Sequence, residues 1–216
     1  GSVVRLLILS KSTGSDSKAR EVSLVRNEIQ LEDQAAKSYL IDDMVNAPGL
    51  RIGVIEIPAF YRDFRAESQG DADFRSTTRD VRILLEDLSR QGVDGVVVDL
   101  RGNGGGSLTE ATALTGLFID QGPVVQVKDS FGKVEVENDP DPGVVYTGPL
   151  AVLVDRNSAS ASEIFAGAMQ DYGRGLIIGE PTFGKGTVQT LIDLNRYVPG
   201  SEEDLGRLRL TMAEFY

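Results

Sequence analysis

The chain contains no histidine and no cysteine among its 216 residues. Without cysteine it has no disulfide, no thiolate zinc site and no cysteine nucleophile. Without histidine it lacks the side chain that most often serves as general base and as metal ligand. Any nucleophilic catalysis by this chain must therefore give its proton to a different side chain.

Basic residues are also outnumbered, with 22 Lys and Arg against 33 Asp and Glu and a net charge of −11. Because nucleic acids and anionic membranes are bound through clustered Lys and Arg, we expect neither as a partner. No run of about 18 apolar residues is present, so we expect no membrane span. No signal-peptide pattern follows Gly1.

The sequence pattern divides the chain into three parts. Residues 1–31 hold two strand-like stretches, VVRLLIL and REVSLVRNEI, around the loop sequence SKSTGSDSK, which predicts a β-hairpin. A hairpin is marginal alone, so it should pack on something or belong to a larger domain. Residues 32–49 lack a clear period and are predicted to be a linker. Residues 50–216 are predicted to form the main domain.

Strand-like and helix-like stretches alternate within the main domain, which indicates an α/β layered fold. RIGVIEI, DGVVVDL, GPLAVLVD and GLIIG are predicted strands. STTRDVRILLEDLSRQG is a predicted helix whose apolar face would be Val81, Leu84, Leu85 and Leu88. SLTEATALTGLFI is a second predicted helix, with Ser107 and Glu110 in capping-box spacing. A third, SEIFAGAMQDYG, follows a run of serines.

The serine run RNSASASE offers three candidate hydroxyl groups, those of Ser158, Ser160 and Ser162. One interpretation is purely structural, because Ser160 and Glu163 also have capping-box spacing. The other is that one of the three serines is a nucleophile. The pattern alone does not choose between the two interpretations or among the serines.

The segment after the third helix is placed to return a lysine to these serines. A helix of roughly 12 residues from Ser160 is ~18 Å long, and GLIIG spans about 17 Å as a strand. If that strand runs back beside the helix, TFGKGTVQ brings Lys185 to the helix start. A lysine acts as a base near neutral pH only if its pKa falls by ~3 from ~10.4, which requires about 4 kcal/mol from an apolar setting. Gln189 is placed to orient the amine, although such a lysine is more often an exposed cation.

Two nucleotide-binding patterns are matched only in part. GEPTFGKGT begins like G-x-x-x-x-G-K-[ST], but Gly186 follows Lys185 and the hydroxyl is displaced to Thr187. That motif also opens a helix, whereas TVQTLIDL is typical of a strand. RGNGGGS departs from G-x-G-x-x-G, because Ser107 replaces the last glycine. We therefore expect no bound nucleotide.

The glycine loop RGNGGG joins a predicted buried strand to a predicted helix. Glycines allow positive φ and let backbone N–H groups point at a ligand, and a helix start favours an anion. Acyl transfer needs such donors for its oxyanion. A simple tight turn explains the same glycines, so this loop alone does not distinguish an oxyanion-binding loop from an ordinary turn.

Three stretches together resemble the carboxyl-terminal processing proteases, also called tail-specific proteases, which are serine peptidases with a Ser–Lys dyad. They are DLRGNGGG, LVDRNSASASEIFAGAMQDYGR and GEPTFGKGTVQ, in the family's order and spacing. The similarity covers about residues 50–195. It implies an α/β fold related to those of crotonase and the Clp protease subunit, and it implies no metal or organic cofactor.

The resemblance also implies a role for each matching residue. Ser160 would be the nucleophile, Lys185 the general base and Gln189 the support of the lysine. The oxyanion donors would be backbone N–H groups near Gly105 and Gly106 and that of Ala161.

Three further residues match family motifs without a role in the dyad itself. Glu163 and Thr182 are expected to support the catalytic residues without contacting the substrate. Asp171 matches an acidic residue that is grouped with the dyad in close relatives. We keep it as a third catalytic candidate, although eleven positions along a helix place it ~16 Å from Ser160, which favours a role in the helix–turn structure.

The N-terminal hairpin resembles the last strands of the PDZ domain that precedes the protease core in this family. PDZ domains bind a peptide C-terminus by strand addition. The first part of such a domain is absent from this sequence, and the family core continues beyond Tyr216. Residues 1–31 are therefore expected to be an incomplete PDZ-like domain, and residues 50–216 a truncated protease core.

The resemblance implies a bacterial, periplasmic endopeptidase that selects protein substrates by an apolar C-terminal tail and cleaves through an acyl-enzyme. One alternative is a non-catalytic peptide-binding or scaffold member of the same fold, or an inactive fragment. The residues argue against this alternative, because the serine, the lysine and the glycines are all present. A second alternative is a crotonase-like acyl-thioester enzyme. Such an enzyme would not need Lys185, and the sequence has no feature specific to a nucleotide-bearing thioester.

Overall fold

The computed structural model describes residues 1–9, 19–26, 34–42, 45–139, 141–198 and 205–216. The chain divides into two compact units, Gly1–Asp33 and Gln34–Tyr216. The predicted hairpin loop and the last residues of the second predicted strand lie outside the described residues.

The first unit is a two-stranded antiparallel sheet. Strand β1 (Val3–Ile8) pairs with β2 (Arg20–Val25), with Val3 opposite Val25. The predicted hairpin is confirmed, while its membership of a PDZ domain stays a prediction. Every residue of β1 is exposed within this unit, as expected of two strands without a covering layer.

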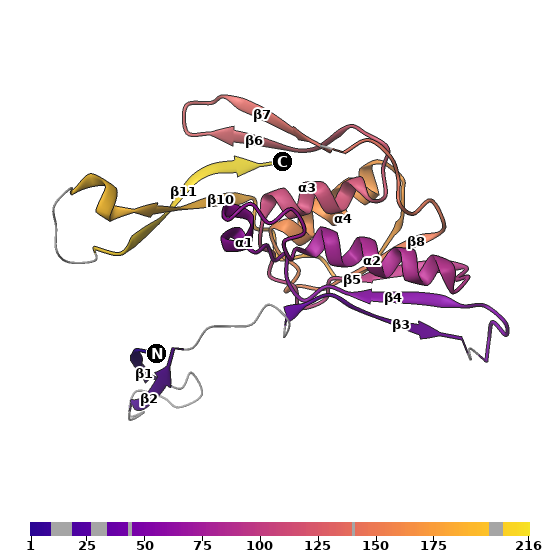
Figure 1. The fold of residues 1–216 in the computed structure, drawn as a ribbon, viewed down its shortest axis with the longest axis horizontal. Helices are drawn as coiled ribbons and strands as arrows, with labels where there is room; N and C mark the ends of the chain where they lie inside the picture. The colour runs from indigo at the N-terminus through magenta and orange to yellow at the C-terminus, as the bar shows by residue number, and fades with distance from the viewer. Residues whose placement is uncertain (10–18, 27–33, 43–44, 140, 199–204) are drawn as a thin grey trace. The chain divides into compact units, whose positions relative to one another are not determined.

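The second unit is built on a five-stranded sheet (Figure 1). In spatial order its strands are β3 (Lys37–Ile41), β4 (Ile52–Glu56), β5 (Gly95–Asp99), β8 (Leu150–Val154) and β9 (Leu176–Gly179). The last four run parallel, and β3 is antiparallel to β4. The predicted strands are confirmed, and their continuous apolar sequences agree with burial on both faces of the sheet.

The edge strand β3 corrects the prediction of a linker over residues 32–49. Its sequence KSYLI alternates, with Ser38 and Leu40 partly buried and their neighbours exposed. Pairing with β4 supplies the backbone hydrogen bonds that the short segment lacks alone. Ala36, just before the strand, is buried and donates its N–H to the Tyr61 hydroxyl at 3.0 Å. The main domain thus begins before residue 50.

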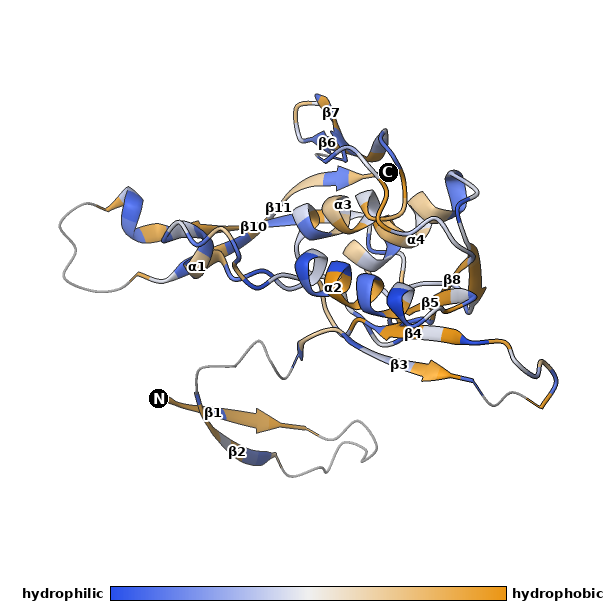
Figure 2. Ribbon diagram, turned by 45° about the vertical axis from the view of Figure 1, so that its right-hand side comes forward, coloured by the Kyte–Doolittle hydropathy of each residue, from blue (hydrophilic) through white to orange (hydrophobic). Residues whose placement is uncertain are grey.

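Three helices connect the parallel strands. They are α2 (Thr77–Arg90), α3 (Leu108–Gly116) and α4 (Ala161–Asp171). Helix α2 packs against β4 and buries Val81, Leu85 and Leu88, with Leu84 partly buried, as its period predicts. Its outer face is hydrophilic (Figure 2).

A second, antiparallel sheet lies on the other side of the helices (Figures 1 and 2). Its order is β10 (Thr187–Asp193), β11 (Arg207–Phe215), β6 (Pro123–Asp129) and β7 (Val134–Asn138). Helices α3 and α4 both contact β6, so the helices are the middle layer. The arm formed by β10 and β11 projects beyond this layer (Figure 1). Two short helices, α1 (Phe64–Ser68) and a 3₁₀ turn (Leu194–Tyr197), were not predicted from the sequence.

The predicted capping box at the start of α3 is only half formed. Ser107 Oγ accepts the Glu110 N–H at 3.3 Å, but the Glu110 carboxylate does not turn back to the cap. It is fully buried and binds Arg62 Nη1 at 2.6 Å and Thr78 Oγ1 at 2.7 Å. A buried carboxylate needs a charged partner more than a helix end needs a second cap. Glu110 thereby fastens α3 to α2 and to the loop before α1.

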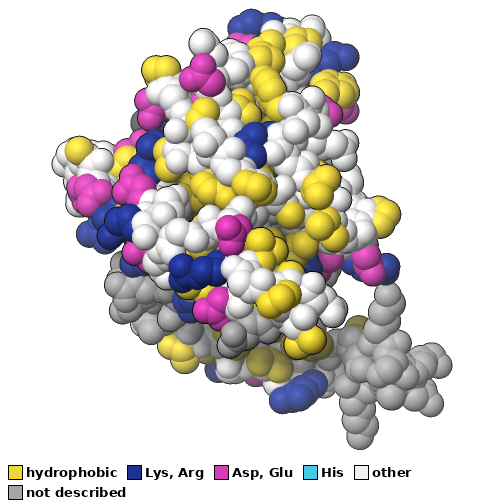
Figure 3. Space-filling view, turned by 90° about the vertical axis from the view of Figure 1, so that its right-hand side faces the viewer, with side chains coloured by type: hydrophobic (Ala, Val, Ile, Leu, Met, Phe, Trp, Pro, Cys, Tyr) yellow, Lys and Arg dark blue, Asp and Glu magenta, His cyan; other side chains and the backbone are white. Residues whose placement is uncertain are grey.

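Among the described residues, no helix has both the length and the apolar character to cross a bilayer. On the face shown in Figure 3, Lys and Arg side chains are scattered rather than gathered into one patch.

Candidate active site

The glycine loop and the serine turn meet at one edge of the main sheet. The glycine loop follows β5 and the serine turn follows β8, and these strands are parallel neighbours. Their carboxyl ends therefore lie at the same edge. The Gly102 N–H donates to Asp155 Oδ1 at 3.0 Å across this edge. That hydrogen bond, followed by those from Asn157 and Ser158, holds the pKa of the Asp155 carboxyl below its usual range against the effect of partial desolvation.

Ser160 has a strained backbone at the start of α4. Its φ is 59° and its ψ is −112°, and it is the only non-glycine residue with positive φ in the described part of the chain. Such a conformation costs on the order of 1–3 kcal/mol and persists only where surrounding contacts hold it, often at functional sites. The strain singles out Ser160 in a way that the sequence did not.

The other two serines of the run are committed to structural contacts. Both are fully buried. Ser158 Oγ donates to Leu100 O at 2.8 Å, and Ser162 Oγ donates to Asn103 O at 3.0 Å. Ser160, by contrast, lines a surface cleft. The Ser160 hydroxyl is therefore accessible, whereas those of Ser158 and Ser162 are buried and hydrogen-bonded to backbone carbonyls.

Gly105 allows the glycine loop to touch the serine turn. Its φ is 98°, and a Cβ there would lie 2.6 Å from Ala159 O and 2.8 Å from Ser160 Cβ. No side chain fits in that space, and the positive φ disfavours one independently. Glycine at this position is therefore required for the close approach.

The backbone amides around Ser160 differ in whether they are already bonded. The Gly105 N–H donates to Asn103 Oδ1 at 2.8 Å, so it is occupied. Within the described residues, the N–H groups of Gly106 and Ala161 have no protein acceptor, and both residues line the cleft. The predicted set of donors is thus narrowed to Gly106 and Ala161, and their role stays a prediction.

Glu163 ties the serine turn to the lysine loop. Its Oε2 accepts the N–H of Ser160 at 2.7 Å and that of Lys185 at 2.9 Å. Its Oε1 accepts the Thr182 hydroxyl at 2.8 Å and the Gly184 N–H at 2.6 Å. Burial raises the pKa of this carboxyl, but the four hydrogen bonds outweigh burial and hold the pKa below its usual value. Glu163 and Thr182 thus contact the serine turn and the lysine loop, and their supporting role stays a prediction.

Lys185 lies in the same cleft as Ser160. The predicted return is present, since α4 is followed by β9 parallel to β8 and then by the lysine loop. The cleft has a volume of about 280 Å³. Its apolar walls come from Phe64, Leu108, Ile164, Val188 and Phe215. Within the described residues no ion pair involves Lys185, which leaves its amine available.

Gln189 and Asp171 are placed differently from each other. Gln189 lines the cleft beside Lys185, and its Nε2 donates to Thr211 Oγ1 at 3.5 Å. No hydrogen bond between Gln189 and Lys185 is present in the described structure. Asp171 is the last residue of α4, at the opposite end from Ser160, and is exposed beside a different hollow. The structure does not bring Asp171 to the serine and lysine.

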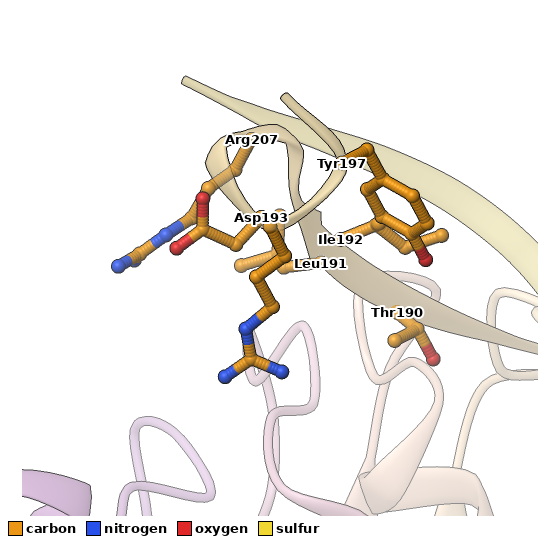
Figure 4. Close-up of a pocket in the computed structure, with 7 residues that line it drawn as sticks. Thr190, Leu191, Ile192, Asp193, Tyr197 and Arg207 are labelled. Atoms are coloured by element: carbon orange, nitrogen blue, oxygen red, sulfur yellow. The ribbon is translucent and has the colours of Figure 1, made fainter. Parts of the chain in front are cut away.

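A second hollow, of about 400 Å³, lies on the arm formed by β10 and β11 (Figure 4). Its lining is Thr190, Leu191, Ile192, Asp193, Arg196, Tyr197 and Arg207. Because its lining contains neither a lysine nor a serine, we place the chemistry in the smaller cleft. The described residues contain no group of three or more metal-ligating side chains.

Comparison with known families decides the classification of this arrangement. The model of peptidase family S41 matches residues 51–216. The chain belongs to peptidase family S41. The expectation drawn from the three motifs is thereby confirmed at the level of the family.

Relatives within family S41 carry names of the same kind. The chain is 47% identical over its whole length to the tail-specific protease of Haemophilus influenzae, and covers 28% of that protein. It is 34% identical over 90% of its length to the carboxyl-terminal-processing protease of Picosynechococcus, of which it covers 41%. Its fold matches the photosystem II D1 C-terminal processing protease with a TM-score of 0.70 at 29% identity, covering all of this chain and 51% of that one. The chain therefore spans about half or less of the length of each of these three proteins.

Sequence reasoning missed one residue of this S41 site. Asn103 is fully buried between the glycine loop and the serine turn. Its only sequence signal is an asparagine among glycines at the end of a buried strand. That signal is typical of an ordinary turn, so its contacts had to come from the structure.

Proposed function

We propose that the full-length protein is a serine endopeptidase with Ser160 as nucleophile and Lys185 as general base. The observation that carries the proposal is the cleft itself. It holds the one strained, accessible serine of the run together with a lysine that has no ion pair and two backbone amides that have no acceptor among the described residues. Nucleophile, base and oxyanion donors are the three parts that acyl transfer requires.

The proposed reaction begins when a peptide carbonyl enters the cleft beside Ser160. Ser160 Oγ attacks the carbonyl carbon and its proton passes to the neutral amine of Lys185. The N–H groups of Gly106 and Ala161 donate to the oxyanion of the tetrahedral intermediate. Collapse expels the amine product, which takes the proton from Lys185 and leaves an acyl ester on Ser160. Water then attacks the ester by the same steps, which frees the acid product and restores the serine.

The proposed substrates are proteins with apolar C-terminal tails. The apolar walls of the cleft favour uncharged side chains beside the scissile bond. Selection by the tail rests on the resemblance and on the names of the relatives. The first unit, as part of a PDZ-like domain, would bind the tail by strand addition. The proposed location is the bacterial periplasm, which cell fractionation of the source organism would test.

The test uses the full-length protein and one substrate protein with either an apolar or a charged C-terminal tail. We expect cleavage of the apolar-tailed form, and a loss of at least about 1,000-fold in Ser160→Ala and Lys185→Arg. Ser89→Ala and Lys128→Arg are matched controls at exposed positions and should cleave like the wild type. Retained cleavage in either site variant contradicts the dyad, and equal cleavage of both tails contradicts tail selection.

A further inference from the structure

Asn103 is buried behind the cleft and makes hydrogen bonds to both halves of the site. Its side-chain Nδ2 donates to Ile57 O at 2.7 Å, directly after the end of β4. Its Oδ1 accepts the Gly105 N–H at 2.8 Å. The side chain thus anchors the glycine loop to the main sheet and occupies the amide that precedes Gly106.

The main-chain carbonyl of Asn103 binds the serine turn. It accepts the Ala159 N–H at 3.0 Å and the Ser162 hydroxyl at 3.0 Å. These residues stand on either side of Ser160. One residue therefore fixes the glycine loop through its side chain and the nucleophile turn through its backbone.

We propose that Asn103 is a positioning residue that sets the separation of the two oxyanion donors, the amides of Gly106 and Ala161. This inference rests on the proposed function. Gly106 directly follows Gly105, whose N–H the Asn103 side chain accepts. Ala161 lies between Ala159 and Ser162, which both donate to the Asn103 carbonyl. An oxyanion site works only when its donors are placed in advance at hydrogen-bonding distance from the developing charge. Asn103 supplies that placement without touching the substrate.

An asparagine is required because one planar group must donate to Ile57 O and accept from Gly105 N–H. Leucine has a similar size but offers neither, and it would leave a buried carbonyl and a buried N–H unpaired. Aspartate keeps the acceptor for Gly105 but turns a second oxygen towards Ile57 O. The two substitutions therefore separate loss of the whole anchor from loss of the donor alone.

The decisive measurement is the single-turnover rate constant for acylation of the full-length protein by a peptide ester. We expect Asn103→Leu to lower this rate constant about 100-fold, the effect of losing one oxyanion donor, and Asn103→Asp to lower it about tenfold. Binding of the uncleaved peptide, measured in Ser160→Ala with and without Asn103→Leu, should change by less than about threefold, because oxyanion donors act in the transition state.

A merely structural role would reduce the amplitude of acylation, which counts folded molecules, and leave the rate constant unchanged. Thr115→Val is the matched control, since it removes a fully buried hydroxyl at the far end of α3 and should alter amplitude alone. An unchanged rate constant in folded Asn103→Leu, or in Asn103→Asp if the leucine variant does not fold, overturns the inference. Cleavage by Ser160→Ala instead overturns the proposed function, and this inference with it.

Discussion

A single oxygen, Glu163 Oε2, holds Lys185 to the serine turn. It accepts the Lys185 N–H at 2.9 Å and the Ser160 N–H at 2.7 Å. The two residues come from opposite ends of a helix–strand unit and, in the described part of the chain, no backbone hydrogen bond joins them directly. A carboxylate suits this position because it accepts several N–H groups at once and donates none. Glu163 is therefore more than the helix cap that its spacing predicted.

Replacing Glu163 by glutamine should weaken both folding and catalysis. The amide nitrogen would face two of the four donors that the carboxylate accepts, leaving them unpaired. We expect the free energy of unfolding to fall by about 2–4 kcal/mol and kcat to fall at least about tenfold. Urea denaturation and peptide hydrolysis measure the two effects. Glu180→Gln, which breaks only the exposed pair with Arg156, should change stability by no more than about 0.5 kcal/mol.

The lowered pKa of Glu163 predicts how stability depends on pH. The folded state holds this carboxyl deprotonated below its usual pKa of 4.5, so it binds fewer protons than the unfolded chain. Stability from Glu163 is then present above about pH 4.5 and is lost as pH falls through the folded pKa. Urea midpoints measured from pH 6 to pH 3 should fall more steeply in the wild type than in Glu163→Gln. Parallel curves would contradict the assignment, since Asp155 is common to both proteins.

Substitutions at Gly105 and Gly102 test whether the close approach of the glycine loop to Ser160 matters. Both have positive φ, but a Cβ at Gly102 meets nothing within 4 Å, while one at Gly105 meets Ala159 O at 2.6 Å. Gly102→Ala should therefore cost only the conformational strain, about 1–2 kcal/mol. Gly105→Ala should cost more and should abolish measurable peptide cleavage, because the glycine loop must move away from Ser160. Equal losses in both variants would show that the contact is unimportant.

Lys185 as base predicts a loss of activity on the acid side. A protonated amine accepts no proton, so kcat/KM of the full-length protein should fall as the pH is lowered, and none of the 216 residues of this chain is a histidine that could produce the same profile. Hydrolysis of a neutral peptide measured from pH 5 to pH 9 tests this. A flat profile in a protein that is folded throughout would exclude Lys185 as the base.

The parts of this fold that the sequence predicted are those with strong local signals. The parallel strands and α2 carry unbroken or periodic apolar residues, and each formed where expected. Strand β3 was missed because its stability comes from pairing with β4. Each of its residues pairs with one that lies at least 11 positions later in the sequence. The short helix α1 buries no residue, so no apolar period marked it.

The candidate site was predictable in its residue types and unpredictable in its contacts. The family motifs selected Ser160 and Lys185, and the structure places both in one cleft. The strain at Ser160, the commitment of Ser158 and Ser162, and the anchoring by Asn103 depend on tertiary hydrogen bonds. Such bonds leave no periodic trace in a single sequence.

The central claim is that Ser160 becomes acylated with the help of Lys185. The most direct measurement is mass spectrometry of the full-length protein, quenched in acid during turnover of an activated peptide ester, with the acyl group located by peptide mapping. The account predicts an adduct on Ser160 that is absent in Ser160→Ala and forms far more slowly in Lys185→Arg. An adduct on Ser158, Ser162 or any other residue, or equal acylation without Lys185, would contradict it.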